Sequence, residues 1–157
     1  MLQAIKPEQE VYVMGNDQNQ EVSIEELIRL AIDQLQFSYT PYSGFKVGAA
    51  LLTKGGKIYT GCNIENAAYT PTNCAERTAF FKAVSGGERA FCAICIVGGK
   101  DGVLTGYTAP CGVCRQVMME FCNPNTFQVI LAVSKEKYKI FTLKELLPLG
   151  FGPENLV

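Results

Sequence analysis

Three cysteines and one glutamate have the types and the spacing of a metal site with a proton-transfer group beside it. Cys111 and Cys114 are separated by two residues in PCGVCRQ. Cys74 precedes Glu76 by two positions in NCAERTAF. Catalytic zinc sites use three protein ligands and leave the fourth position to water, and because the chain has no histidine, any such site must use other side chains. Glu76 would lie close to the metal but too near Cys74 to be an easy fourth ligand, which is where a general acid/base should stand.

Both cysteine motifs are expected at the first turn of a helix. One helix should run from near Cys74 to about Ser85, and another should begin near Cys111, where Pro110 suits the helix start. Three thiolates on a divalent zinc ion leave a net charge of about −1, and two helix N-termini, each worth about half a positive charge, would offset it. We expect Arg77 to donate a hydrogen bond to a ligating sulfur from outside the ligand set.

The other cysteines are expected to be core residues. Cys92 and Cys95 form a second C-x-x-C pair, but they lie in a predicted strand, where residues three apart point to opposite faces. That pair therefore should not hold one metal ion. Cys62 and Cys122 are expected to be small, buried apolar residues.

A simpler role for Glu76 stays open. Asn73 followed by Glu76 is also the spacing of a helix N-cap and its return partner. In that interpretation Glu76 would stabilise the start of the helix and transfer no proton. The Cys111 and Cys114 pair and the absence of histidine favour the catalytic interpretation.

The elements that must position these residues alternate between strand and helix. A capping box at Ser23 and Glu26 opens an amphipathic helix, and a second cap at Thr142 and Glu145 opens a short final helix. Strands are predicted over residues 45–53, 58–64, 90–99 and 126–134. This order predicts an α/β fold with helices on both faces of one sheet. Residues 1–21 are interpreted as an N-terminal extension of unknown role, and residues 22–157 as a single domain.

Composition narrows the class of protein further. The net charge is −1, from 14 basic and 15 acidic residues without runs, so we expect no binding to long nucleic acid. No apolar run approaches about 18 residues, which argues against a membrane span, and the N-terminus does not resemble a secretory signal. Seven cysteines in such a chain fit a reducing compartment and a cytoplasmic protein.

Several motifs together resemble the cytidine deaminases of the small, homotetrameric, zinc-dependent type. Cys-Ala-Glu followed by Pro-Cys-x-x-Cys is the signature of zinc deaminases that act on nucleobases. Further matches lie in the stretches YTPYSGFKVGAALL, GCNIENAAYTPTNCAERTAF, PCGVCRQVMMEF and LLPLGFGPENL. The resemblance runs from about Ser23 to Leu156. It implies a three-layer α/β/α fold with a central mixed sheet.

The resemblance also implies the reaction and the metal ligands. The reaction is hydrolytic deamination of cytidine and 2′-deoxycytidine to uridine and 2′-deoxyuridine with release of ammonia, a step of pyrimidine salvage. One zinc ion per chain would be held by Cys74, Cys111 and Cys114. Glu76 would move protons, and the backbone around Ala75 would contact the base.

Other residues are implied to bind the nucleoside or a neighbouring subunit. Asn63 and Glu65 would hydrogen-bond the ribose hydroxyls, although Asn63 can also be the turn residue that ends a strand. Phe45 would line the pocket, Tyr69 would lie at an interface, and Phe151 would cover the base in a neighbour's site. The site is therefore expected to be shared between subunits.

Two departures and two alternatives accompany this resemblance. Residues 1–21 are additional, and Asn73 stands where an apolar residue is more usual. The nearest alternative is deamination of another cytosine nucleoside such as blasticidin S. The alternative from another class is a structural zinc-binding interaction protein, which would need a closed four-ligand site.

Overall fold

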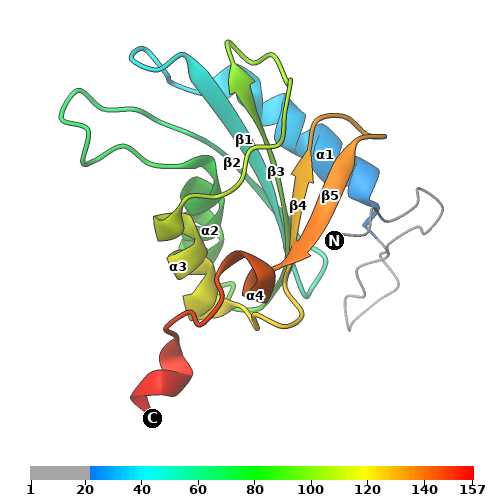
Figure 1. The fold of residues 1–157 in the computed structure, drawn as a ribbon, viewed down its shortest axis with the longest axis vertical. Coiled ribbons are helices and arrows are strands. Elements are labelled where there is room, and N and C mark those ends of the chain that lie inside the picture. The colour runs from blue at the N-terminus through cyan, green and yellow to red at the C-terminus, as the bar shows by residue number, and fades with distance from the viewer. Residues whose placement is uncertain (1–21) are drawn as a thin grey trace.

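The chain forms one sheet with helices on both faces (Figure 1). The computed structural model describes residues 22–157, so the expected extension over residues 1–21 lies outside the described residues. The strands are β1 (Phe45–Thr53), β2 (Ile58–Cys62), β3 (Phe91–Lys100), β4 (Gln128–Ala132) and β5 (Tyr138–Thr142). The α-helices are α1 (Ile24–Asp33), α2 (Ala75–Ser85), α3 (Gly112–Phe121) and α4 (Leu143–Leu146). Two 3₁₀ segments, η1 (Gln34–Phe37) and η2 (Pro153–Leu156), complete the described elements.

The sheet is mixed, as expected. Its strand order is β2-β1-β3-β4-β5. β3 and β4 run parallel, while β1–β2, β1–β3 and β4–β5 are antiparallel. The predicted hairpin of β1 and β2 is confirmed, with Gly48 opposite Cys62 at one end and Leu52 opposite Ile58 at the other. Parallel pairing of β3 and β4 requires a crossover, and α3 supplies it.

Alternation along the strands separates two apolar clusters and so produces three layers. Ala50 and Leu52 of β1 pack with α1 on one face of the sheet. Ala49 and Leu51 pack with α2, α3 and α4 on the other face. Figure 1 shows α1 alone on its side and α2, α3 and α4 together on the opposite side. The predicted three-layer α/β/α architecture is therefore confirmed.

β5 is the strand that the sequence pattern did not predict. It is short, it lies at the edge of the sheet, and its residues are half-buried or exposed. Lys137 and Lys139 are exposed around Tyr138, so the segment reads as polar. Its pairing with β4, not its own periodicity, makes it a strand.

The expected opposite orientation of Cys92 and Cys95 is wrong. Both pack with the cluster on the α1 face, Cys95 fully buried and Cys92 partly so. The register between β1 and β3 shifts at Leu52 and Thr53, and such an irregularity breaks strict alternation. Both cysteines are still packing residues, as expected.

Of the two capping boxes predicted from the sequence, one is complete in the structure and the other is partly formed. Thr142 and Glu145 form the complete capping box of α4. Ser23 accepts from the backbone N–H of Glu26 at 3.2 Å, but the Glu26 carboxylate binds Arg29 instead of returning to the cap. The first cap therefore has one of its two expected bonds.

Candidate metal centre and active site

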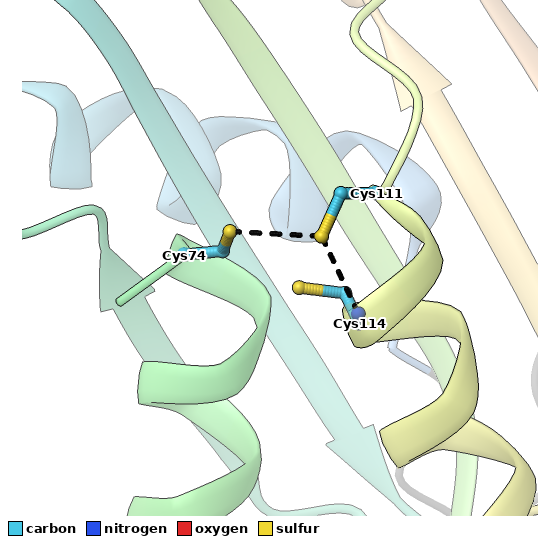
Figure 2. Close-up of side chains that lie close together, drawn as sticks. All are labelled: Cys74, Cys111 and Cys114. Atoms are coloured by element: carbon cyan, nitrogen blue, oxygen red, sulfur yellow. Dashed lines mark hydrogen bonds between the residues drawn. The ribbon is translucent and has the colours of Figure 1, made fainter. Parts of the chain in front are cut away.

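Cys74, Cys111 and Cys114 converge at the N-termini of two helices, as Figure 2 shows. Their sulfur atoms all lie within 4.8 Å of one another, and the Sγ atoms of Cys74 and Cys111 are 3.9 Å apart. A tetrahedral zinc with Zn–S bonds of about 2.3 Å requires sulfurs about 3.8 Å apart. The three thiols therefore fit a zinc ion. Within residues 22–157 they are the only group of three or more potential ligands of this kind.

The helix starts are placed by close backbone packing. Cys74 is the N-cap residue of α2, and Cys111 is the N-cap residue of α3. Gly61 of β2 lies directly against α2, because a Cβ at this position would be 2.4 Å from the carbonyl oxygen of Ala75. Only glycine permits this approach. The strand and the start of α2 therefore hold the first ligand in place together.

The surroundings of the thiols favour a thiolate at Cys74. A hydrogen bond from the Cys114 thiol, aided by Arg77, lowers the pKa of Cys74 to about 5 despite partial burial. The same bond raises the pKa of Cys114, whose thiol is the donor. The N–H of Cys114 also donates to the Cys111 sulfur at 3.5 Å. Thiolates are the form that binds zinc.

Glu76 lies in the first turn of α2 and is only 4% exposed. Burial raises the pKa of its carboxyl to about 7. The capping interpretation of this residue is wrong, because Cys74 is the N-cap and no side chain caps the helix. The side chain of Asn73 donates instead to Thr78 Oγ1 at 3.0 Å. Glu76 is therefore a buried carboxyl beside the three thiols that makes no capping bond, and such a group is suited to proton transfer.

Arg77 contacts the sulfur of Cys74, the atom expected to bind zinc. Its Nη2 atom lies 3.5 Å from Cys74 Sγ and 3.4 Å from the carbonyl oxygen of Thr72. The bond to Cys74 raises the pKa of the guanidinium. The positive charge stabilises the thiolate and partly offsets the negative ligand set.

Asn63 and Glu65 lie after β2 and organise the neighbouring backbone. The Asn63 amide accepts from the N–H of Val47 at 2.9 Å and donates to the carbonyl of Phe45 at 2.8 Å. The Glu65 carboxylate accepts from the N–H groups of Tyr42 and Ser43 and from the Ser43 hydroxyl. These bonds lower the pKa of Glu65, with the Ser43 hydroxyl as the largest cause, so this carboxylate is charged at neutral pH.

The remaining predicted site residues divide by exposure. Ala75 is completely buried at the start of α2, where N–H groups lack partners within the helix. Phe45 and Phe151 are 38% and 58% exposed, and Tyr69 is 74% exposed and contacts Tyr42. Three large aromatic residues, two expected to bind substrate and one expected at an interface, are thus uncovered in the single chain.

Two positioning residues were missed by sequence reasoning. Thr78 Oγ1 donates to the carbonyl of Cys62 at 3.0 Å and so ties α2 to the end of β2. Arg115 donates through Nε to the carbonyl of Pro110 at 2.7 Å, just before the second ligand. A polar residue one turn after each helix start was the available signal. The sequence did not reveal its long-range partners, which are the carbonyl of Cys62 for Thr78 and that of Leu146 for Arg115.

Comparison with known proteins agrees with this geometry. The family described as "Cytidine and deoxycytidylate deaminase zinc-binding region" matches residues 21–130. A cytidine deaminase of Sporosarcina psychrophila is 49% identical over 135 residues, which cover 86% of this chain and 96% of that protein. A cytidine deaminase of Halalkalibacterium halodurans is 47% identical over 130 residues, covering 83% and 95%.

Solved structures give the same result. The crystal structure of cytidine deaminase from Burkholderia pseudomallei superposes with a TM-score of 0.76 and 45% identity, over 83% of this chain and 100% of that one. That of Mycobacterium tuberculosis superposes with a TM-score of 0.68 and 36% identity, over 80% and 94%. The chain belongs to the zinc-dependent cytidine and deoxycytidylate deaminase family. Its cofactor is zinc, which the three thiols fit.

Proposed function

We propose that this enzyme deaminates cytidine and 2′-deoxycytidine hydrolytically to uridine and 2′-deoxyuridine and releases ammonia. The observation that carries the proposal is the buried carboxyl of Glu76 in the same helix turn as a ligand of a three-thiol zinc site. Family membership and relatives that are cytidine deaminases support it. Cys74, Cys111 and Cys114 are the proposed ligands of one zinc ion per chain.

Glu76 performs the proton transfers in this proposal. When bound, zinc supplies a Lewis acid that lowers the pKa of water. Glu76 accepts a proton from the attacking water and delivers it to N3 of the pyrimidine as C4 is attacked. It then accepts a second proton, from the hydroxyl now on C4, and delivers it to the departing amine as the C4–N bond breaks. The raised pKa of about 7 suits a group that must take and give a proton near neutral pH. A bound zinc ion would favour the charged form of this carboxyl. Arg77 holds the Cys74 thiolate.

The nucleoside is proposed to bind between the metal and the start of β1. Asn63 and Glu65 supply an amide and a charged carboxylate for the ribose hydroxyls. Phe45, whose carbonyl is already fixed by Asn63, gives an apolar wall, and the backbone at Ala75 contacts the base. A small nucleoside fits these groups better than long nucleic acid, given the net charge of −1.

The proposed assembly is a homotetramer with sites shared between subunits. Tyr69 and Phe151 are highly exposed in the single chain, and a neighbouring subunit would cover both. Phe151 would lie over the base in the neighbour's site. None of the helices in residues 22–157 has the length and hydropathy of a membrane span. Cytoplasmic pyrimidine salvage is the proposed setting.

The remaining proposals concern domain limits and alternatives. Residues 22–157 form the proposed catalytic domain, and residues 1–21 an extension of unknown role. Blasticidin S is a less suitable substrate, since Asn63, Glu65 and Phe151 match a plain nucleoside. A closed structural zinc site is not favoured, because the ligand group in residues 22–157 has three members.

One experiment tests the proposal directly. The purified chain should contain about one zinc ion and convert cytidine to uridine. The conversion is measured by the loss of absorbance of the cytosine ring. Blasticidin S should be converted far more slowly at the same concentration. A zinc-loaded chain that leaves cytidine unchanged would refute the proposed reaction.

A further inference from the structure

The C-terminal tail, defined as residues 147–157, is docked on α3. Gln116 Nε2 donates to the carbonyl oxygen of Phe151 at 2.9 Å. Gly152 is buried beside it, and a Cβ at Gly152 would lie 3.0 Å from Cε of Met119. The main chain at the Phe151 carbonyl and at Gly152 is therefore held against α3, the helix of Cys111 and Cys114.

The start of the tail is attached to α3 by Arg115. Its guanidinium donates to the carbonyl of Pro110 at 2.7 Å and to that of Leu146 at 2.5 Å. Pro110 is buried and precedes α3, and Leu146 is the last residue of α4, so neither carbonyl has a partner within a helix. A planar guanidinium can satisfy both carbonyls at once, because its donors are fixed in a fork. This arginine thereby joins the segment before Cys111 to the beginning of the tail.

The backbone between the two attachments is strained. Leu149 has φ of 56° and is fully exposed. Leucine rarely adopts this left-handed conformation, which persists only where the surroundings determine it. The Leu149 side chain is exposed, and the N–H of Gly150 donates to the carbonyl of Leu147 at 3.3 Å. This turn, held between the attachments at Leu146 and Phe151, fixes the conformation of Leu149.

Phe151 itself combines a fixed main chain with an uncovered ring. Its carbonyl is held by Gln116, yet the residue is 58% exposed. A large aromatic residue held in this way contributes little burial to its own chain. The attachment presents the ring to something outside the chain.

We propose that Arg115 and Gln116 are positioning residues that fix the tail on α3 and so set the place of the Phe151 ring relative to the zinc ligands. The ring's use as a lid over the pyrimidine rests on the proposed function, whereas the attachment of the tail does not. In a tetramer with shared sites, these two residues connect the metal helix of one site to the lid of the next.

Gln116→Met in the zinc-loaded full chain tests the attachment, since methionine has a similar length and no donor. Hydrogen exchange of the tail, measured by mass spectrometry, should accelerate about tenfold while the zinc content stays near one per chain. KM for cytidine should rise about two- to tenfold, with kcat changed less than about threefold, as expected for loss of one hydrogen bond. The matched control is Gln36→Met, which removes the Gln36 bond to the Asp33 carbonyl far from the tail. This control should change neither the hydrogen exchange of the tail nor KM for cytidine.

A double-mutant cycle tests whether Gln116 acts through Phe151. Adding Gln116→Met to Phe151→Ala should raise KM no further, because the ring it positions is gone. Arg115→Lys should also accelerate exchange of the tail, since one ammonium cannot replace the two-carbonyl fork. Unchanged tail exchange in Gln116→Met, or fully additive effects on KM in the double variant, would overturn the proposal. Hydrogen exchange of the tail can be measured without turnover. A chain that does not deaminate cytidine but shows faster tail exchange in Gln116→Met would refute the proposed reaction and keep the attachment.

Discussion

The metal region and the nucleoside region of this site differ in how much of them one chain completes. Cys114, Ala75 and Glu76 are buried, and their helices are tied to the sheet at Gly61 and Thr78. Phe45, Tyr69 and Phe151 remain exposed. The three thiols and Glu76 are thus brought together within one chain, although Cys111 is still exposed to solvent. The aromatic residues proposed for base binding and assembly are surfaces that a second subunit can cover.

The metal region should fail completely when one ligand is removed. Cys111→Ala is expected to lose zinc and all measurable turnover, because a three-ligand site cannot spare a thiolate. Zinc content and cytidine turnover check this result. Cys92→Ala is the matched control and should keep both. Zinc loss in the control but not in Cys111→Ala would mean that the wrong cysteine pair was assigned.

Glu76→Gln should separate the metal from the chemistry. The amide keeps the shape of the side chain but cannot take a proton, so kcat should fall at least about 10²- to 10⁴-fold. Zinc content and the unfolding temperature should stay near those of the unchanged protein. Substantial turnover by this variant would remove Glu76 from the proton-transfer role.

Glu65→Ala should act on recognition and leave the metal region intact. A sugar hydroxyl loses a charged acceptor, worth about 1.5–3 kcal/mol, which corresponds to a rise in KM of about 10- to 150-fold. Glu65→Gln keeps an acceptor and should be milder. Because the Glu65 carboxylate also holds Tyr42 and Ser43, zinc content must be measured alongside KM. Loss of zinc in Glu65→Ala would contradict the separation of the two regions.

The exposed lid should be exchangeable between chains. Stacking of an aromatic ring on a base is worth about 1–3 kcal/mol, so a variant that ends at Leu147 should bind cytidine poorly. Glu76→Ala with an intact tail should be inactive because it lacks the proton-transfer group. Refolded together, the two variants can form a site with Glu76 from one chain and Phe151 from the other. At a cytidine concentration too low for the tail-less variant to bind, turnover should therefore appear only in the mixture. Full activity of the tail-less variant alone, or inactive mixed oligomers, would show that no neighbour supplies the lid.

The sequence predicted the local parts of the site better than the long-range ones. The start of α3 at the Cys111 motif was readable because helix capping and ligand spacing are local. β5 was not readable, since its identity comes from pairing with β4. The orientation of Cys92 was misjudged because a register shift at Leu52 and Thr53 leaves no mark in the sequence. The role of Arg115 was overlooked because its partner, the carbonyl of Leu146, lies 31 residues away in the chain.

The lysines of β5 have a consequence for how copies of this chain can meet. Lys137 and Lys139 are exposed on and beside the outermost strand, and the Lys139 ammonium lies 4.9 Å above the ring of Tyr107. Charge on an edge strand discourages another strand from pairing there, which protects a sheet from open-ended aggregation. The charge therefore disfavours pairing of two copies through this edge. Acetylation of these two lysines would remove that protection.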